Sequence, residues 1–239
     1  MIKKTIKIFL ILFLSFQYSS GQSKIGTWNV LNVNLKISEK WNVFTEAQLR
    51  SLSLYDEFHY YEIKTGGTFK INKQFAATAG FGSYNTYSEL GNFNNPIQNK
   101  EIRTWLQMNI KQNLGIFVIE QRYRAEQRFT SNGYKNRFRY RIGASIPINN
   151  IVIKEKTFYV NVWSEIFLTN KEPFFERNRL LLGIGYEFNK KLAIQTGYIY
   201  QFDYKINDET GKDFINVALL YNFDLTNKTD KEFIPTTSD

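Results

Sequence analysis

Apolar and polar residues alternate along most of the chain with a period of two, the pattern of β-strands that have one apolar and one polar face. In one segment Trp41, Val43 and Leu49 share a face, while Glu46 and Arg50 occupy the other. The pattern predicts an all-β fold with eleven candidate strands, at 27–37, 41–50, 61–71, 75–82, 102–111, 116–129, 137–146, 157–168, 179–188, 192–202 and 214–225.

The first residues have the features of a secretory signal peptide. Three lysines within the first seven residues precede the unbroken apolar run 8–14, and the small residues Ser19 and Gly21 stand three and one before Gln22. The apolar run is well short of the roughly 20 residues that span a bilayer, which argues against an uncleaved anchor. We therefore expect export, with removal of residues 1–21.

No later segment has the length and apolarity of a transmembrane helix, so a membrane location would depend on strands. Aromatic residues make up 17% of the chain, with 15 Tyr and 21 Phe, as expected where rings line two membrane interfaces. Residues 22–225 are predicted to form one antiparallel β-barrel in the outer membrane, followed by a polar, disordered tail at 226–239.

The expected strand number follows from a general rule and not from the count of segments. Single-chain bacterial barrels have even strand numbers. We therefore favour 12 strands, with 10 as the alternative, over the eleven segments counted.

Tight connections at 38–40, 72–73, 113–114 and 189–191 alternate with longer polar ones at 51–58, 87–100, 130–135 and 203–212. Short periplasmic turns and long external loops are typical of these barrels, although 149–155 is long where a tight turn is due.

Arginine residues determine which face of the strands points inward. Arg137, Arg139 and Arg141 share one face, and each would cost about 2 to 4 kcal/mol if it pointed into lipid at mid-membrane. These side chains must therefore point into the lumen, although Gln121 and Gln127 interrupt the apolar face of the preceding segment. The predicted lumen cluster consists of Glu120, Arg122, Arg124, Glu126, Arg128, Arg137, Arg139, Arg141, Glu165, Arg177, Arg179 and Glu187.

Two interpretations of this cluster are open. The first is a lumen filled by an Arg/Glu network, because small barrels are filled by their side chains. The second is a narrow anion-favouring pore or a site for an acidic ligand, since arginines outnumber carboxylates in the cluster.

Six segments together resemble a known family. They are EIRTWLQMNIKQ from Glu101, EQRYRAEQRF from Glu120, NRFRYRIGASIPI from Asn136, WSEIFLTN from Trp163, FFERNRLLLGIGYEF from Phe174 and LAIQTGYIYQF from Leu192. In this order they are similar to the uncharacterised outer-membrane barrel family known as domain of unknown function 2490. The resemblance covers nearly all of the mature chain and implies a barrel, but it brings no activity, ligand or catalytic residue.

Few residues point to catalysis. The absence of Cys removes a lipoprotein anchor, a thiol nucleophile and a Cys-ligated metal site. His59 is the single histidine and a weak candidate for a serine–histidine pair, because Tyr61 stands where a same-face serine would be. Ser51, Ser53, Ser83 or Ser88 could still approach it from the same end of the barrel. We expect a non-enzymatic barrel without metal or cofactor, the alternatives being an outer-membrane lipase or acyltransferase and a periplasmic lipid-binding barrel.

Charge suggests the partners. The net charge of +9 falls to +6 when Lys3, Lys4 and Lys7 leave with the signal peptide. An exported chain seldom meets nucleic acid, so outer-membrane lipid and lipopolysaccharide headgroups are the expected counter-charges. The barrel-assembly machinery is the expected partner during insertion, although Tyr221 and Phe223 are followed by a polar tail and not by the chain end.

Overall fold

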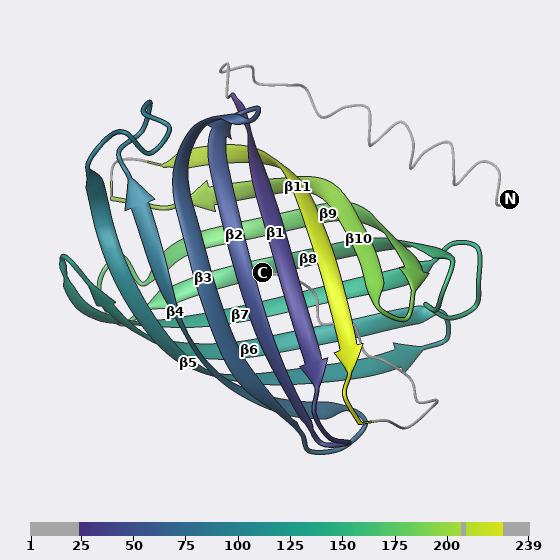
Figure 1. Ribbon diagram of the computed structural model, residues 1–239. Helices are drawn as coiled ribbons and strands as arrows, with labels where there is room; N and C mark the ends of the chain where they lie inside the picture. The colour runs from purple at the N-terminus through teal and green to yellow at the C-terminus, as the bar shows by residue number, and fades with distance from the viewer. Residues whose placement is uncertain (1–23, 207–208, 227–239) are drawn as a thin grey trace, which may run out of the picture.

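The computed structural model describes residues 24–206 and 209–226, which form one closed β-barrel (Figure 1). The predicted signal peptide and all of the predicted tail except Thr226 lie outside the described residues. Among the described residues, no helix has the length and apolarity needed to span a bilayer. The strands are β1 (Ile25–Lys36), β2 (Trp41–Ser53), β3 (Asp56–Lys70), β4 (Phe75–Tyr87), β5 (Ile97–Leu114), β6 (Phe117–Thr130), β7 (Gly133–Pro147), β8 (Thr157–Thr169), β9 (Phe175–Asn189), β10 (Leu192–Asp203) and β11 (Thr210–Asp224).

Consecutive strands pair antiparallel, and the barrel closes where β1 pairs with β11 in parallel. The parallel register runs from Ile25 opposite Asp213 to Lys36 opposite Asp224. Strand β1 therefore begins at one end of the barrel, here called the N-terminal end, and β11 finishes at the other, the C-terminal end. The connections 54–55, 88–96, 131–132, 170–174 and 204–209 lie at the N-terminal end, and 37–40, 71–74, 115–116, 148–156 and 190–191 at the C-terminal end.

The structure corrects the predicted strand number, because the described barrel has eleven strands and neither 12 nor 10. An even number is required only when every neighbouring pair is antiparallel. The single parallel pair β1–β11 removes that requirement. The segment before Ile37 contributes one strand, Ile25–Lys36, and no further crossing within the described residues.

The lengths of the connections also differ from expectation. The predicted long loops at 51–58 and 130–135 are two-residue turns at 54–55 and 131–132, because polar residues continue the strands to the rim. Conversely, the connection 148–156 is as long as 88–96 at the opposite end. Four of the five C-terminal connections are nevertheless short, as predicted.

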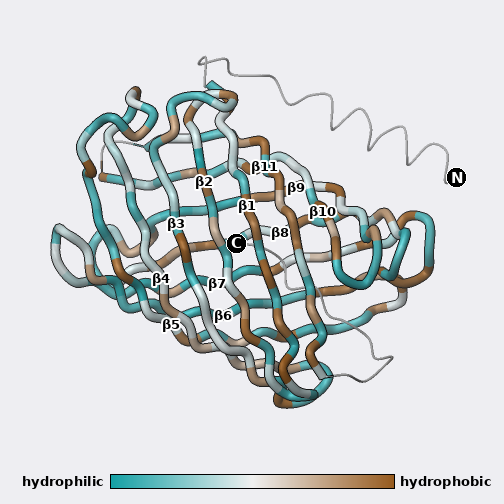
Figure 2. The backbone as a smooth tube through the Cα atoms, viewed as in Figure 1, coloured by the Kyte–Doolittle hydropathy of each residue, from teal (hydrophilic) through white to brown (hydrophobic). Residues whose placement is uncertain are grey.

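The alternating residues of the strands form the inner and the outer face of the barrel. On β7, Arg137 is 3% exposed and the next residue, Phe138, is 51% exposed. A similar alternation follows most of the other strands, as the colours along the tube in Figure 2 show, although some inward positions of β1, β9, β10 and β11 are apolar. The three arginines of β7 point inward, in the register that the sequence predicted.

The two glutamines that interrupt the outward face form sideways hydrogen bonds on the barrel wall. The Tyr123 and Tyr140 hydroxyls donate to Gln121 Oε1 at 3.2 and 3.1 Å. The Thr104 hydroxyl donates to Gln127 Oε1 at 3.2 Å. These amide oxygens therefore have partners without a bulge in β6.

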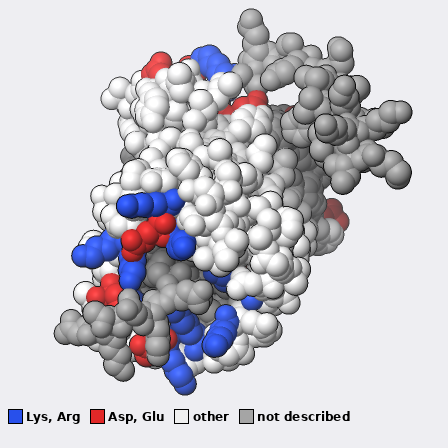
Figure 3. Space-filling view, turned by 90° about the vertical axis from the view of Figure 1, so that its right-hand side faces the viewer, with Lys and Arg blue, Asp and Glu red and all other residues white. Residues whose placement is uncertain are grey.

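Outward aromatic side chains form two belts, one near each end of the barrel. The N-terminal belt contains Tyr61, Tyr87, Phe129, Tyr134, Phe175 and Phe202, and the C-terminal belt contains Trp41, Phe69, Phe158, Tyr186, Phe188, Tyr221 and Phe223. Apart from Asp213 of β11, which accepts a hydrogen bond from the Tyr198 hydroxyl, the outward positions of the described strands between the belts carry no Lys, Arg, Asp or Glu. Figure 3 shows one side of this wall as almost free of charged side chains, with basic and acidic side chains gathered at the C-terminal end.

One inward glycine makes room for a large lumen ring. A Cβ added at Gly80 of β4 would overlap the Trp105 indole. Gly67 of β3 points outward instead, where a Cβ would be 3.9 Å from the Trp41 ring, an ordinary contact.

We predict that Gly80→Ala lowers the free energy of unfolding by about 1 to 3 kcal/mol, because the filled lumen cannot accept another methyl group without strain. The matched variant Gly67→Ala is expected to be near neutral. Urea titration of the folded form, followed by gel migration, measures both. Equal effects of the two substitutions would contradict the packing of Trp105 against Gly80.

Candidate functional site

The lumen is crossed by an ionic network in which single glutamates are shared by several arginines. The centre of this network is Glu165 on β8, which is 0% exposed. Its carboxylate accepts hydrogen bonds from Arg122 at 2.5 Å, from Arg139 at 2.9 and 3.0 Å, and from Arg141 at 3.3 Å. These arginines come from β6 and β7, so one carboxylate on β8 binds the charged side chains of two neighbouring strands.

The network continues toward the N-terminal end through Glu126. Arg139 donates to Glu126 Oε1 at 2.9 Å, and Arg124 and Arg137 approach the same carboxylate at 3.6 and 3.8 Å. Arg139 thus links Glu126 to Glu165.

Two more glutamates hold the arginines nearest the N-terminal mouth. Glu101 accepts from Arg103 at 2.6 and 3.0 Å and from Arg128 at 2.7 Å. Glu176 accepts from Arg137 at 2.6 and 2.7 Å, with Arg128 3.4 Å away.

A second network lies on β2 and β3. Lys64, 2% exposed, forms ion pairs with Glu46 at 2.7 Å and with Glu62 at 2.9 Å. Glu62 also pairs with Arg50 at 3.3 Å and accepts a hydrogen bond from the Tyr60 hydroxyl. Buried charges of this kind are tolerated only when paired, which these contacts achieve.

The structure brings together most, but not all, of the predicted lumen cluster. Nine of its members, Arg122, Arg124, Glu126, Arg128, Arg137, Arg139, Arg141, Glu165 and Arg179, are buried side chains in the middle and N-terminal parts of the lumen. Arg177, half-buried, pairs there with Asp203. Glu120 and Glu187 lie toward the C-terminal end, where Glu120 lines the same cavity as Arg122 and Arg141.

Sequence reasoning missed several members of the network. They are Glu46, Arg50, Glu62, Lys64, Glu101, Arg103, Glu176 and Asp203. The alternation had already placed Glu46 and Arg50 on a polar face, which was the available signal. Which of these charges meet inside the lumen depends on the stagger between strands, which has no signal in the sequence.

Arginine side chains also surround buried aromatic rings. Four guanidinium carbons, of Arg137, Arg139, Arg177 and Arg179, lie 4.6 to 5.7 Å from the centre of the Phe167 ring. The Trp28 ring has Arg50 at 3.4 Å and Arg179 at 4.7 Å. Buried apolar side chains also form a cluster inside the barrel, which consists of Trp28, Val30, Trp163, Leu181, Ala193, Ile199, Phe214, Ala218 and Leu220.

The lumen contains two separate cavities. One of about 330 Å³ opens at the N-terminal end, and one of about 120 Å³ lies toward the C-terminal end, with no lining residue in common. Along β3, Glu62 lines the first and Thr68 the second, and Lys64 is buried between them. Along β8, Phe167 lines the first cavity and Trp163 the second, and the buried Glu165 lies between them. A layer of buried side chains therefore closes the middle of the barrel.

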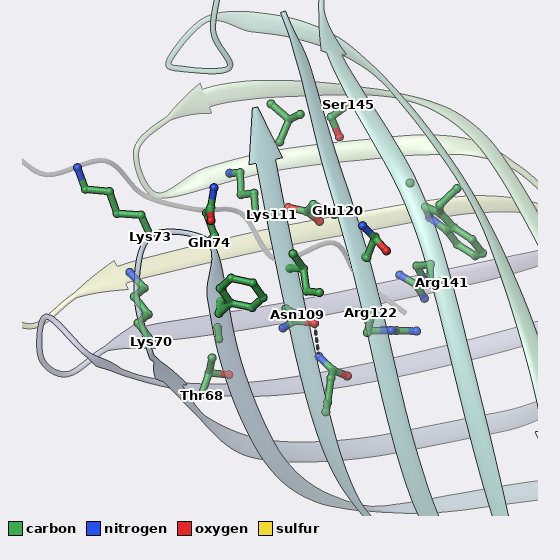
Figure 4. A pocket seen from close by; sticks show the side chains of 18 of the residues that line it. Thr68, Lys70, Lys73, Gln74, Asn109, Lys111, Glu120, Arg122, Arg141 and Ser145 are labelled. Carbon is green, nitrogen blue, oxygen red and sulfur yellow. Dashed lines mark hydrogen bonds between the residues drawn. The ribbon is translucent and has the colours of Figure 1, made fainter. Parts of the chain in front are cut away.

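Figure 4 shows the C-terminal cavity. Its labelled side chains include Lys70, Lys73 and Lys111 near the mouth and Arg122 and Arg141 at the inner end. The dashed line marks the hydrogen bond that Gln107 donates to Asn109 at 2.8 Å.

His59 lies on β3 at the N-terminal cavity and does not form a catalytic pair. Its Nδ1 is buried without a hydrogen-bond partner, and no serine of the described chain bonds to its ring. The Ser51 hydroxyl instead contacts Thr27 Oγ1 at 2.6 Å and donates to the Ser53 carbonyl oxygen at 2.6 Å. Within 24–206 and 209–226, no group of three or more His, Asp and Glu side chains is placed to hold a metal ion.

These observations define a class of protein, a closed β-barrel with an uncharged outer wall and an ionic lumen. The model of the family described as protein of unknown function DUF2490 matches residues 25–212, and the chain belongs to this family. The resemblance seen in the sequence is thereby confirmed for the family, whose description assigns no activity. Comparison with curated proteins and with solved structures gave no match.

Proposed function

We propose that the protein is a non-enzymatic, integral outer-membrane β-barrel whose lumen is closed at its middle. The observation that carries the proposal is the inverted polarity of the barrel. Large apolar side chains such as Leu106 and Phe81 are 69% and 59% exposed on the outer wall, while Glu165 and Lys64 are 0% and 2% exposed inside. Extensive apolar surface outside and charges within fit a lipid environment and not water.

Dimensions and aromatic positions support the same location. The strands have 12 to 18 residues, more than the 9 to 11 or so that a tilted strand needs to cross a bilayer. The two aromatic belts lie where interfaces with the headgroups would be, with an uncharged wall between them.

The short connections suggest an orientation. The turns 37–40, 71–74, 115–116 and 190–191 share the C-terminal end, and short turns face the periplasm in outer-membrane barrels. In this orientation the N-terminal cavity opens to the outside. Basic residues at the mouths favour contact with anionic lipid and lipopolysaccharide headgroups, and insertion would require the barrel-assembly machinery.

The geometry gives less support to the other candidate functions. A continuous pore is interrupted by the buried layer that contains Lys64 and Glu165. A periplasmic lipid-binding barrel would need an apolar cavity, whereas the N-terminal cavity is lined mainly by charged side chains. A lipase or acyltransferase of the serine–histidine kind lacks the required contact at His59.

Three measurements test the proposal: gel migration and bilayer conductance of the purified protein, and carbonate extraction of membranes that contain it. Unheated protein is expected to migrate differently from boiled protein on a gel and to resist extraction from membranes by carbonate, because a closed barrel in lipid stays folded and integral. In planar bilayers the same protein is expected to give no large, stable conductance step. Release by carbonate would contradict the membrane location, and a large stable conductance would contradict the closed lumen.

A further inference from the structure

The N-terminal cavity carries an excess of positive charge. Its lining includes nine basic side chains but only four carboxylates, those of Glu62, Glu89, Glu101 and Glu176. Three further carboxylates lie just beyond this lining and pair with its arginines. Asp203 pairs with Arg177, and Glu126 and Glu165 pair with Arg139. Even with these three carboxylates included, basic groups remain in the majority around the cavity.

Arg179 is the arginine of this cavity with the weakest neutralisation. It is 5% exposed, and its hydrogen bond goes to the neutral amide oxygen of Gln201 at 2.8 Å. Within the described chain no carboxylate lies within ion-pair distance of it. Arg177, Arg50 and Arg139 repel it, and Glu165 attracts it from beyond that distance. A buried guanidinium in such surroundings is costly unless an anion reaches it.

Two other cavity residues have unused polar atoms. Nε of Arg50 and Nδ1 of His59 are both buried without hydrogen-bond partners. Arg50 and Arg179 both pack against the Trp28 ring, which holds their guanidinium groups near each other. Guanidinium forks bind carboxylate and phosphate oxygens with two parallel hydrogen bonds.

We propose that the N-terminal cavity is a binding site for a small oxyanion-bearing ligand, a phosphate or carboxylate compound, held by Arg179 and Arg50 with His59 as a third donor. The cavity volume of about 330 Å³ is at the lower end of the range of ligand sites and limits the ligand to a small molecule. The site rests on the proposed function, because a closed barrel oriented as above exposes this cavity to the outside.

The test is calorimetric titration of the folded protein, in zwitterionic detergent at low salt, with inorganic phosphate and separately with citrate. We expect saturable binding of at least one of the two, and the one that binds identifies the ligand as a phosphate or a carboxylate compound. Arg179→Gln should weaken that binding at least tenfold. Lys111→Gln, which removes one positive charge from the opposite cavity, should leave it unchanged.

A third variant separates binding from folding. Arg179→Lys retains the charge and therefore the fold, but it lacks the two-pronged donor geometry and should also weaken binding. Folded wild-type protein that binds neither probe at millimolar concentration would overturn the site, and so would equal weakening by Lys111→Gln. These outcomes leave the closed barrel intact, because gel migration and bilayer conductance test that proposal independently.

Discussion

Glu165→Gln is expected to lower the free energy of unfolding by about 3 to 5 kcal/mol, the usual cost of removing one partner from a buried ion pair. The substitution retains the size of the side chain and removes its charge. Arg122, Arg139 and Arg141 would then surround a neutral amide whose own NH₂ group repels donors. Such a loss is a large share of the roughly 5 to 15 kcal/mol that stabilises a typical domain.

The matched control is Glu187→Gln, another buried lumen glutamate. Within the described chain Glu187 has no cation at ion-pair distance, and its interacting neighbour is Tyr159. Its replacement should therefore change stability much less. Urea titration of the folded barrel, followed by its gel migration, measures both variants. If the two variants unfolded at the same urea concentration, the central role of Glu165 would be disproved.

Leu182→Arg is expected to prevent stable insertion into the membrane. Leu182 is the central residue of β9 and points outward with 52% of its surface exposed. At mid-membrane an arginine on the lipid face costs about 2 to 4 kcal/mol. The folded, carbonate-resistant fraction in membranes should therefore fall strongly.

The control for this prediction uses the same strand, face and substitution. Phe188 lies in the C-terminal aromatic belt and is 46% exposed, nearly as much as Leu182. Near an interface the cost of arginine falls to about 0 to 1 kcal/mol, so Phe188→Arg should insert almost normally. In water the two similarly exposed positions would respond alike. Equal insertion of both variants would therefore refute the proposed membrane location.

Strand formation was predictable because it depends on local alternation. The charged triplet of β7 fixed its register, and the structure has Arg137, Arg139 and Arg141 buried as predicted. The number of strands was predicted wrongly because the rule of even numbers assumes antiparallel closure. With eleven strands and antiparallel neighbours, β1 and β11 run in the same direction, and adjacent residues do not encode that the sheet closes on this pair.

The ionic network was predictable in its composition and only partly in its pairing. Arg128 was expected in a cluster with later glutamates, and it pairs with Glu101, which had not been considered, as well as with Glu176. Partners on neighbouring strands depend on the stagger between strands, and partners across the lumen depend on the barrel diameter. Neither quantity can be read from the period of a single strand.

The sequence by itself determined which side chains share a face of the sheet and which face points inward. A period of two leaves only two registers for each strand, and the register that would turn the charges outward is excluded. It thereby determined an uncharged outer wall and a charged interior. Only the tertiary structure decided that β1 and β11 close the barrel in parallel, that Glu165 and Lys64 lie in a layer that separates two cavities, and that Arg179 is left with a neutral partner. Each of these depends on the stagger and closure of eleven strands, which are set by packing across the whole lumen.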